Sequence, residues 1–484
     1  MTIRTLCPLA VCAAATVLQI DAQPLTEDLK ILPDPGRVQG LFGDELDLHD
    51  GVAVVASKGV FTLQIPGEAG LYDAATGAKL ADLPLPVTPA VRLVVFGCAI
   101  GPDRAAVGTR VDGQPVYTNT VWLFDTTTPS APTLLDQIQP SDADFSDAFG
   151  DAIAIDGPLM LVGAPGDSDN GGLSGSAYLF DTATGVERAK LKPADGAPLD
   201  EFGFSVDLDT AAGFAIVGAR RRDGLTGVAF LFDVSDPSNP VELATLSSSD
   251  RMPGDQYGFD VAVEGSIALV GAIFNDEAGF DAGAAYVYDL TTPTAPVEIA
   301  KIIPSDADPT DDFGWTVNLE AGLALITSRT DDDIAPGGGS GYLFDMADPA
   351  NPVELTKIVP TDTEANDVFG WSAAFDADNM LIGASQEDDA AENAGAAYVF
   401  AVPADTCPAD TNGDGNLTPA DFNAWVLAFN NQLPACDQNG DGLCQPNDFN
   451  AWILNFNTGC SRLIRATRAA PRPASASSAP AGRR

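Results

Sequence analysis

Short apolar runs alternate with polar turns along most of the chain, and the turns are rich in Gly, Asp and Pro. Between residues 152 and 193, four strand-like runs follow one another at 152–156, 158–164, 174–181 and 187–193. The first two runs are joined by Asp156-Gly157, a dipeptide typical of tight hairpins. Runs of this length, so closely spaced, predict an antiparallel meander of four strands.

The same order of runs recurs at a near-constant interval, and each copy opens with an aromatic residue followed by glycine. Successive glycines lie 54, 53, 53, 55, 56 and 56 residues apart. A period of this size, filled with short strands, indicates a solenoid or a propeller with one small sheet per repeat. Seven copies favour an all-β, seven-bladed propeller of four-stranded antiparallel blades. The opening pairs are Phe42-Gly43, Phe96-Gly97, Phe149-Gly150, Phe202-Gly203, Tyr257-Gly258, Phe313-Gly314 and Phe369-Gly370.

The last repeat stops at Pro403 without a fourth strand. Near the N-terminus, the run of residues 30–33, Lys-Ile-Leu-Pro, matches the run of residues 357–360, Lys-Ile-Val-Pro. We therefore expect an N-terminal strand, residues 27–33, to complete the seventh blade and to leave no open sheet edge. The predicted propeller spans residues 23–403.

The meander also separates two faces of the predicted disc. In four antiparallel strands, the loop between strands two and three and the link from strand four to the next blade emerge on one side. These segments are long and acidic, which indicates either a ligand-binding surface or a solvated face that keeps the protein soluble. Arg220-Arg221-Arg222 interrupts one loop, and it either binds a sulfate or carboxylate group or neutralises neighbouring carboxylates. The acidic segments are the links 140–150, 304–314 and 360–370 and the loops 165–175, 274–283, 330–341 and 385–395.

The 484 residues include 69 acidic and 24 basic side chains, which gives a net charge of −45. Such a charge argues against nucleic acid and anionic membranes as partners and favours cations. Residues 1–22 combine Arg4, an apolar run over residues 6–18 and small residues, the pattern of a secretory signal peptide. We expect cleavage after Ala22, no lipidation at Cys12, and a bacterial protein that is secreted or attached to the cell surface.

Two loops near the C-terminus have the spacing of calcium-binding loops. Ligands recur at positions 1, 3, 5, 7, 9 and 12, position 7 through its backbone carbonyl, and glycine at position 6 allows the sharp turn. Hard carboxylate and amide oxygens at this spacing suit Ca²⁺, whereas Mg²⁺ prefers a tighter octahedron with retained waters. The predicted ligands are Asp410, Asn412, Asp414, Asn416, Thr418 and Asp421 in the first loop, and Asp437, Asn439, Asp441, Leu443, Gln445 and Asp448 in the second.

Each loop leads into a predicted helix with apolar residues at i, i+3, i+4 and i+7. This spacing gives each helix one apolar face, and the two faces should pack on each other. Bound calcium should supply much of the stability of so small a unit. The apolar residues are Phe422, Trp425, Val426 and Phe429 in the first helix, and Phe449, Trp452, Ile453 and Phe456 in the second.

The repeat resembles the FG-GAP repeat of integrin-type seven-bladed propellers. The resemblance is carried by the Phe-Gly openings and by Val-Gly-Ala-Pro at residues 162–165, echoed at 217–219, 270–272 and 382–384. It covers roughly residues 24–403, although the first two repeats are degenerate. Many members of the family carry a calcium loop between the two motifs. Short hairpins such as Asp156-Gly157 replace that loop here, so the blade calcium sites of the family are not carried over.

The segment of residues 404–460 resembles a type I dockerin module, with its duplicated calcium loop and helix. Its end at residues 457–460, Asn-Thr-Gly-Cys, followed by an Arg-rich tail, is most similar to GC-type dockerin-anchored bacterial proteins. The resemblance implies docking to a cohesin-like or surface-anchoring partner. Loop positions 10 and 11, which commonly carry hydroxyl residues that select the cohesin, hold Pro419-Ala420 and Pro446-Asn447. This departure argues against ordinary cohesin docking.

Five cysteines remain after removal of the signal peptide. Cys98 lies in an apolar run and is expected to be a buried free thiol. For the others we predict the pairs Cys407–Cys460 and Cys436–Cys444, one of three possible pairings. If Gly459-Cys460 is instead a processing site, the first pair does not persist. The tail, residues 461–484, contains six Arg and no acid, predicts disorder, and is either a sorting tail or a solvated basic segment.

Two classes of function fit this sequence. The first is a non-enzymatic binding, adhesion or display protein, whose propeller binds an extracellular protein or glycan and whose C-terminal module anchors it. The alternative is a secreted polysaccharide-active enzyme, a lyase or glycosidase that uses the acidic face. His49 is the only histidine, which excludes a His-based nucleophilic site and a multi-His metal site. Acidic residues occur in every repeat with no distinct pair, which favours binding.

Overall fold

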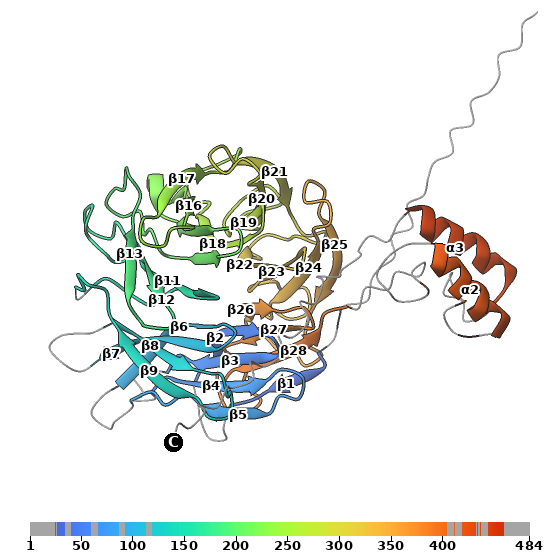
Figure 1. Ribbon diagram of the computed structural model, residues 1–484, viewed down its shortest axis with the longest axis horizontal. Helices are drawn as coiled ribbons and strands as arrows, with labels where there is room; N and C mark the ends of the chain where they lie inside the picture. Colours follow the sequence, from blue (N-terminus) through green and yellow to red (C-terminus); the bar gives the residue numbers. More distant parts are fainter. Residues whose placement is uncertain are drawn as a thin grey trace, which may run out of the picture.

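Seven small sheets are arranged as blades around a central axis in the computed structural model (Figure 1). It describes residues 25, 27–33, 40–59, 66–86, 92–112, 119–144, 146–403, 411, 419–431, 433, 436 and 444–458. The predicted signal peptide and C-terminal tail therefore lie outside the described residues. No helix in the described part of the chain is long and apolar enough to cross a membrane.

Every blade is a four-stranded antiparallel meander, as the sequence pattern predicts. From the axis to the rim, blade one contains β2 (Phe42–His49), β3 (Val52–Ser57), β4 (Glu68–Asp73) and β5 (Lys79–Asp82). Blade two contains β6 (Arg92–Ile100), β7 (Arg104–Asp112), β8 (Asn119–Asp125) and β9 (Thr133–Ile138). Blade three contains β10 (Ile153–Asp156), β11 (Leu159–Ala164), β12 (Ser176–Asp181) and β13 (Glu187–Leu191). Blade four contains β14 (Val206–Asp209), β15 (Phe214–Ala219), β16 (Val228–Asp233) and β17 (Val241–Leu246).

The remaining three blades follow the same order. Blade five contains β18 (Tyr257–Glu264), β19 (Ile267–Ala272), β20 (Ala284–Asp289) and β21 (Val297–Ile302). Blade six contains β22 (Phe313–Glu320), β23 (Leu323–Ser328), β24 (Ser340–Asp345) and β25 (Val353–Ile358). Blade seven contains β26 (Phe369–Phe375), β27 (Asn379–Ala384), β28 (Ala396–Ala401) and β1 (Leu29–Ile31). The three helices are α1 (Arg222–Leu225), α2 (Pro419–Asn431) and α3 (Pro446–Thr458).

The ring is closed by a strand from the other end of the chain. Strand β1 pairs antiparallel with β28, and Leu29 lies opposite Val399 while Ile31 lies opposite Ala397. Without β1, the outer edge of β28 would present its amide and carbonyl groups to solvent. The N-terminal strand therefore supplies the rim strand of blade seven.

The core lies between neighbouring blades, where strands two and three of each blade are buried on both sides. Leu161 and Leu179 of blade three, for example, share one apolar cluster with Phe202 and Phe230 of blade four. The opening aromatic residues sit at the centre of these clusters: Phe202 is fully buried and makes an edge-to-face contact with Phe230 at 5.4 Å between centroids. This burial explains why each repeat opens with an aromatic residue.

The two glycine motifs of the repeat also meet between blades. A Cβ atom built on Gly163 would lie 2.0 Å from the carbonyl oxygen of Gly203 in the next blade. Gly203 itself has a φ of +89°, a conformation that a side chain disfavours. The Phe-Gly pair of one blade and the Val-Gly-Ala run of the preceding blade therefore form one contact that only glycine allows.

One of the predicted opening pairs is wrong. In blade two the fully buried residue opposite Thr109 is Val95, whereas in blade six the aromatic Phe313 occupies the equivalent position opposite Ser328. The irregular segment that follows is shorter in blade two, with one residue between the paired positions instead of three. This shortening places Phe96 in the bulge, and Val95 takes the place of the core aromatic residue.

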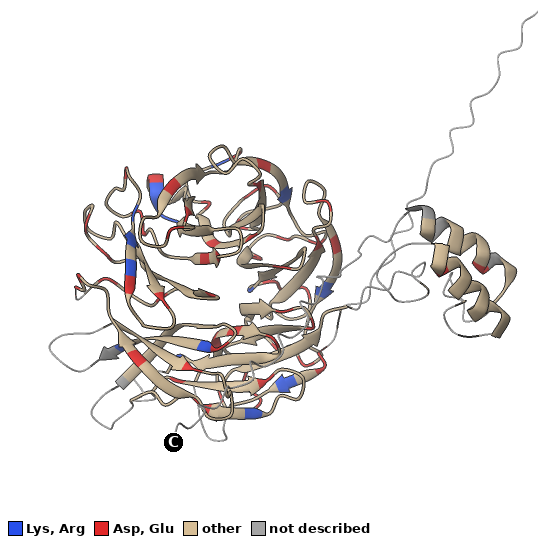
Figure 2. Ribbon diagram, viewed as in Figure 1, with Lys and Arg blue, Asp and Glu red and all other residues tan. Residues whose placement is uncertain are grey.

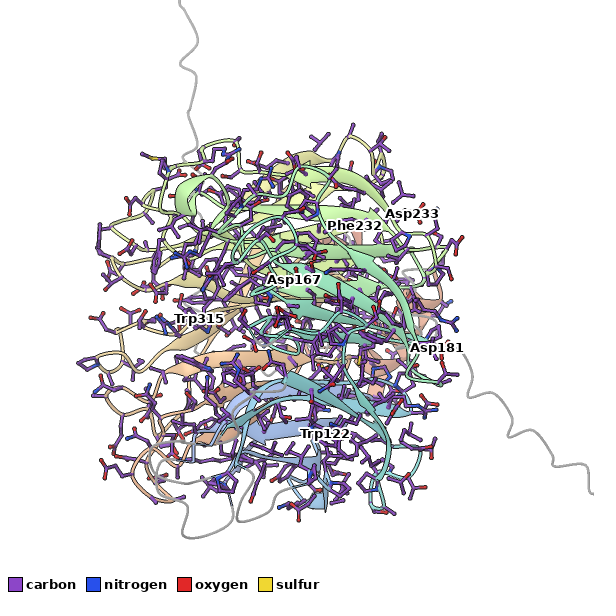
Figure 3. The ribbon with its side chains drawn as sticks, turned by 90° about the vertical axis from the view of Figure 1, so that its left-hand side faces the viewer. Trp122, Asp167, Asp181, Phe232, Asp233 and Trp315 are labelled. Carbon is purple, nitrogen blue, oxygen red and sulfur yellow. A yellow bond between two sulfur atoms is a disulfide. The ribbon has the colours of Figure 1, made fainter. Side chains whose placement is uncertain are left out.

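The disc has one face of long loops and one face of short turns. In blades three to seven the loop between strands two and three hydrogen-bonds to the link that enters the next blade: the Phe202 amide donates to the Ser174 carbonyl at 3.1 Å, and the Phe369 amide donates to the Gly338 carbonyl at 2.9 Å. We call this side the loop face. In Figure 3, Trp315 at the start of blade six and Asp181 and Asp233 at the ends of their third strands lie on opposite sides of the disc.

Candidate functional site

A channel runs along the axis between the innermost strands of all seven blades. Its cavity volume is about 680 Å³ and its walls are β2, β6, β10, β14, β18, β22 and β26. Acidic side chains are spread over every blade around it, and Lys and Arg are few (Figure 2). The channel therefore combines a volume typical of ligand sites with a high density of carboxylates.

Several of these carboxylates bind the backbone of the next blade. An Asp207 carboxylate oxygen accepts a hydrogen bond from the Val263 amide at 2.7 Å, and an Asp260 oxygen accepts one from the Val317 amide at 2.8 Å. Asp47 repeats the arrangement from blade one to blade two. The inner edge of each innermost strand has no neighbouring strand to satisfy its amides, so these carboxylates take that role.

The channel makes these acids weaker than usual. Burial raises the pKa of Asp207 and of Asp260 to about 7, and that of Asp47 to about 6, although the hydrogen bonds from backbone amides act in the opposite direction. In the unfolded chain aspartates titrate near pH 4. At these three aspartates the folded protein therefore binds more protons than the unfolded chain between about pH 4 and pH 7. Their contribution to the stability of the fold should decrease as the pH rises through this interval.

We expect the propeller to melt at a higher temperature at pH 5 than at pH 8. The double variant Asp207→Asn/Asp260→Asn keeps oxygen acceptors for the Val263 and Val317 amides but cannot ionise. It should raise the melting temperature at pH 8 and change it little at pH 5. Differential scanning calorimetry of both proteins measures this, and a wild-type melting temperature that rises steadily from pH 5 to pH 8 would contradict the assignment.

Where the channel opens on the loop face, two positions of each blade form what we call the mouth ring. One position follows the aromatic-glycine pair, and the other follows the second strand or, in blade two, lies near its end. In blades four to seven the first position is aromatic, and the rings contact one another in succession. Centroid separations are 5.3 Å for Phe204–Phe259, 4.6 Å for Phe259–Trp315 and 5.2 Å for Trp315–Trp371. All four side chains line the cavity.

Arginines at the second position stack on this aromatic arc. The Arg220 guanidinium lies 3.5 Å from the Phe204 ring centroid, and its Nε donates to Glu201 at 3.0 Å. The Arg329 guanidinium lies 3.6 Å from the Trp315 centroid, and its Nε donates to Asp312 at 3.1 Å. Each guanidinium is thus held between a ring and a carboxylate.

Blades one to three complete the mouth ring with charged pairs. Lys58 lies 3.0 Å from an Asp44 oxygen, and Arg110 lies 3.6 Å from an Asp151 oxygen. The displaced Phe96 of blade two lies under both cations, at 5.5 Å from Lys58 and 4.3 Å from Arg110. The mouth ring therefore has an aromatic side and a charged side, and each of its four cations is paired with a carboxylate.

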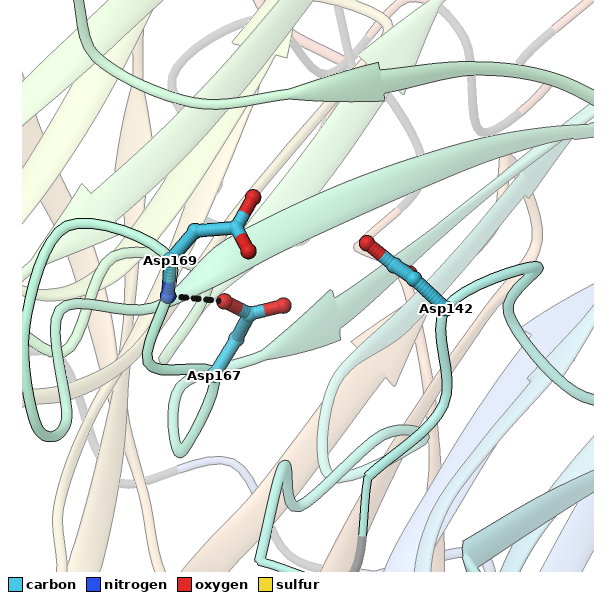
Figure 4. A group of neighbouring side chains, drawn as sticks. All are labelled: Asp142, Asp167 and Asp169. Atoms are coloured by element: carbon cyan, nitrogen blue, oxygen red, sulfur yellow. Dashed lines mark hydrogen bonds between the residues drawn. The ribbon is translucent and has the colours of Figure 1, made fainter.

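Acidic clusters also occur farther out on the loop face. Asp142, Asp167 and Asp169 bring three carboxylates within 4.8 Å of one another, and the Asp169 amide donates to Asp167 at 2.8 Å (Figure 4). The Lys190 ammonium lies among them, at 2.7, 2.8 and 2.9 Å from the three carboxylates. Lys190 also lies over the Tyr178 ring, whose hydroxyl donates to Asp142 and Asp167. The chain thus supplies its own cation where a metal ion would otherwise fit.

Three other blades repeat this cluster of lysine, tyrosine and three acidic or amide side chains, which we call the lysine cage. The hydrogen bonds from the lysine range from 2.6 to 2.9 Å. The members are Lys301 with Tyr286, Asp250, Asn275 and Glu277 in blade five; Lys357 with Tyr342, Asp306, Asp331 and Asp333 in blade six; and Lys30 with Tyr398, Asp362, Glu387 and Asp389 in blade seven.

Blade four explains the run of three arginines. Thr245 stands opposite Phe230 where blade three has Lys190 opposite Tyr178, so blade four has no cage lysine. Arg222 takes its place: it pairs with Asp200 at 3.0 Å and Asp195 at 2.7 Å, and it lies over the Phe230 ring. Arg220 and Arg221 both pair with Glu201. Of the two predicted roles, the structure supports the neutralisation of neighbouring carboxylates.

The C-terminal segment contains the two predicted helices. The ring centroids of Phe422 and Trp452 lie 5.2 Å apart, and those of Trp425 and Phe449 lie 5.5 Å apart, so the apolar faces of α2 and α3 pack on each other. Among the predicted calcium ligands, Asp421, Asp448 and Gln445 are described. The others lie outside the described residues: Asp410, Asn412, Asp414, Asn416, Thr418, Asp437, Asn439, Asp441 and Leu443.

The cysteines agree with the prediction where they are described. Cys436 and Cys444 form a disulfide with 5.5 Å between their Cα atoms, and Cys98 is a buried free thiol in the channel wall. Burial raises the pKa of the Cys98 thiol well above its usual value, so it stays protonated and unreactive. The predicted partners Cys407 and Cys460 lie outside the described residues.

Comparison with known families identifies the repeat. A model of the FG-GAP repeat matches residues 133–180, 186–232, 240–288, 296–344 and 352–400, together half of the chain. The chain therefore belongs to the FG-GAP repeat family, and its fold is that of a seven-bladed propeller. Each match begins at the start of the rim strand of one blade, or one residue before it, and ends in the third strand of the next. No curated protein matches the chain.

Proposed function

We propose that this chain is a non-enzymatic binding, adhesion or display protein that is exported and binds its ligand on the loop face. The observation that carries the proposal is the mouth ring, in which four aromatic side chains line a cavity of about 680 Å³. Binding sites of this size combine apolar surface with a few placed polar groups, as the aromatic and charged sides of the ring do.

The channel chemistry favours binding over catalysis. A glycosidase needs one carboxyl group to protonate the leaving group and a second to attack or to activate water. Asp47, Asp207 and Asp260 hold backbone amides of the neighbouring blade, and Asp44 and Asp151 pair with resident cations. The alternative, a lyase or glycosidase on this acidic face, would release new chain ends from a polysaccharide, which mass spectrometry detects directly.

The same proposal gives residues 404–460 the role of a calcium-dependent, dockerin-like module that attaches the propeller to a surface or partner. Asp421 and Asp448, at position 12 of the two loops, are fully buried in the first turns of α2 and α3. Buried carboxylates at the close of each loop fit the donor set that Ca²⁺ requires. The described helix pair is also small enough for bound metal to contribute much of its stability.

Chelation tests this division of roles. We expect EDTA to unfold residues 407–460 and to leave the β-sheet signal of the propeller largely unchanged, because lysines occupy the acidic clusters of blades three, five, six and seven. Limited proteolysis and circular dichroism of the full chain, with and without calcium, measure the two parts separately. Loss of both signals would show that calcium also stabilises the blades. Loss of neither signal would contradict calcium binding by the C-terminal module.

A further inference from the structure

The mouth ring has the composition of a carbohydrate site. We propose that it binds the end of a neutral glycan, with a sugar ring stacked on Trp371 and hydroxyl groups bonded to the charged side of the ring. This inference rests on the proposed binding function and adds the ligand class. The proposed ligand is a glycan and not a protein.

The aromatic arc supplies the apolar surface. Pyranose rings present flat faces of C–H groups, which pack on the faces of aromatic rings. Trp315 and Trp371 are partly exposed and line the cavity, while Phe204 and Phe259 continue the same surface. Arg220 stacks on Phe204 and Arg329 stacks on Trp315, so Trp371, at the end of the arc, offers the ring on which a sugar can stack.

The charge of the mouth ring selects a neutral ligand. A cationic ligand would meet Lys58 at the cavity wall, and an anionic ligand would meet Asp44 and Asp151. Paired ions still offer both donors and acceptors toward the cavity, which is what a polyhydroxyl ligand needs. Lys58, Asp44 and Asp151 line the cavity, and the Lys58 ammonium lies 6.0 Å from the Trp371 ring centroid.

Glu45 adds a further polar group beside Asp44. It lines the cavity, and burial together with the neighbouring Asp44 raises its pKa well above the usual value. Its carboxyl group adds hydrogen-bonding capacity on the cavity wall beside Asp44. The cavity volume of about 680 Å³ lies in the range of small-ligand sites.

The probes are three sets of hexasaccharides offered to the full-length protein: neutral (cello-, manno- and xylo-), acidic (galacturonic acid) and cationic (glucosamine). We expect binding within the neutral set, measured by isothermal titration calorimetry. Trp371→Leu should weaken the affinity about tenfold or more by removal of one stacking surface. Trp371→Phe keeps a ring and should retain part of the affinity.

The matched control is Phe280→Ser. Phe280 is 68% exposed on a loop of the same face, outside the mouth ring. This variant should bind neutral hexasaccharides as the wild type does, and melting temperatures confirm that each variant is folded. Loss of binding in Phe280→Ser with retention in Trp371→Leu would overturn the site.

The remaining outcomes separate the inference from the proposed function. Preference for the acidic or cationic set, or no binding to any set, overturns the neutral-glycan inference and leaves a binding function open to a protein ligand. Capture of a protein ligand that Trp371→Leu abolishes, without glycan binding, overturns the ligand class only. Shortening of a bound hexasaccharide supports the site and overturns the non-enzymatic function.

Discussion

Deletion of residues 23–36 is expected to lower the melting temperature of the propeller by about 5 °C or more. The deletion removes β1, which is the rim strand of blade seven, and exposes the edge of β28. It also removes Lys30, whose ammonium lies 2.6–2.8 Å from Asp362, Glu387 and Asp389. Three carboxylates would then face one another without a cation, in addition to the lost strand pairing.

Differential scanning calorimetry of the deleted and full-length proteins measures the effect. Deletion of residues 461–484 is the control, because the composition of that tail predicts disorder and the tail lies outside the repeats. An unchanged melt after removal of residues 23–36 would refute closure of the ring by the N-terminal strand. The exposed edge should also make the deleted protein self-associate at high concentration, which size-exclusion chromatography detects.

Lys190→Met should destabilise the propeller by about 3 kcal/mol, because it removes the cation of a lysine cage but keeps the length of the side chain. Asp167 is buried beside the ammonium, and hydrogen bonds from Lys190 lower the pKa of Asp169. Conversely, the carboxylates raise the pKa of Lys190 despite its partial burial. Because the pKa values of Asp142 and Asp169 are lowered, their contribution is present at neutral pH and is lost as the pH falls through the lowered pKa values.

The control lies two residues away on the same strand. Arg188 makes an ion pair with Asp181 at 2.5 Å, but its side chain is 38% exposed, so Arg188→Met should cost about 1 kcal/mol or less. Millimolar calcium should restore part of the stability of Lys190→Met, because Asp142, Asp167 and Asp169 can then hold a metal ion. Equal effects of the two variants in chemical denaturation would contradict the lysine-cage assignment.

The repeat could be predicted from sequence because its constraints are local and recur. A buried aromatic residue, a glycine that tolerates close contact and a hairpin turn are each visible in a single repeat. Blade two shows the limit of this reasoning: Phe96-Gly97 matches the motif in letters, but a shortened bulge moves Val95 into the core position. A deletion of that kind changes which residue faces the core without changing the pattern of residue types.

The lysine cages and the mouth ring could not be predicted in the same way. Each cage joins a strand-four lysine to acids in two different loops, so its members lie up to 359 residues apart, as Lys30 and Asp389 do. The cage pattern is harder to recognise in blade four, because Arg222 at the start of α1 takes the place of the lysine in the fourth strand. Only one signal of the mouth ring was present in the sequence, namely an aromatic residue directly after the aromatic-glycine pair in four successive repeats.

In the C-terminal module more could be predicted from the sequence than the described residues test. Its loop spacing and apolar stripes predict the calcium ligands and the helix packing, and the described part of the chain contains the two packed helices. Of the twelve predicted ligands, Asp421, Gln445 and Asp448 are described. The position-12 aspartates are buried. Calcium binding therefore stays a prediction that chelation tests.

The most direct test of the account is hydrogen-exchange mass spectrometry of the full-length protein with and without the neutral hexasaccharides. We predict slower exchange at the starts of β18, β22 and β26, near residues 257–260, 313–317 and 369–373, and unchanged oligosaccharide masses in the same sample. Protection confined to the short turns on the opposite face, or hexasaccharides cut to shorter products, would contradict a non-enzymatic binding site at the mouth of the channel.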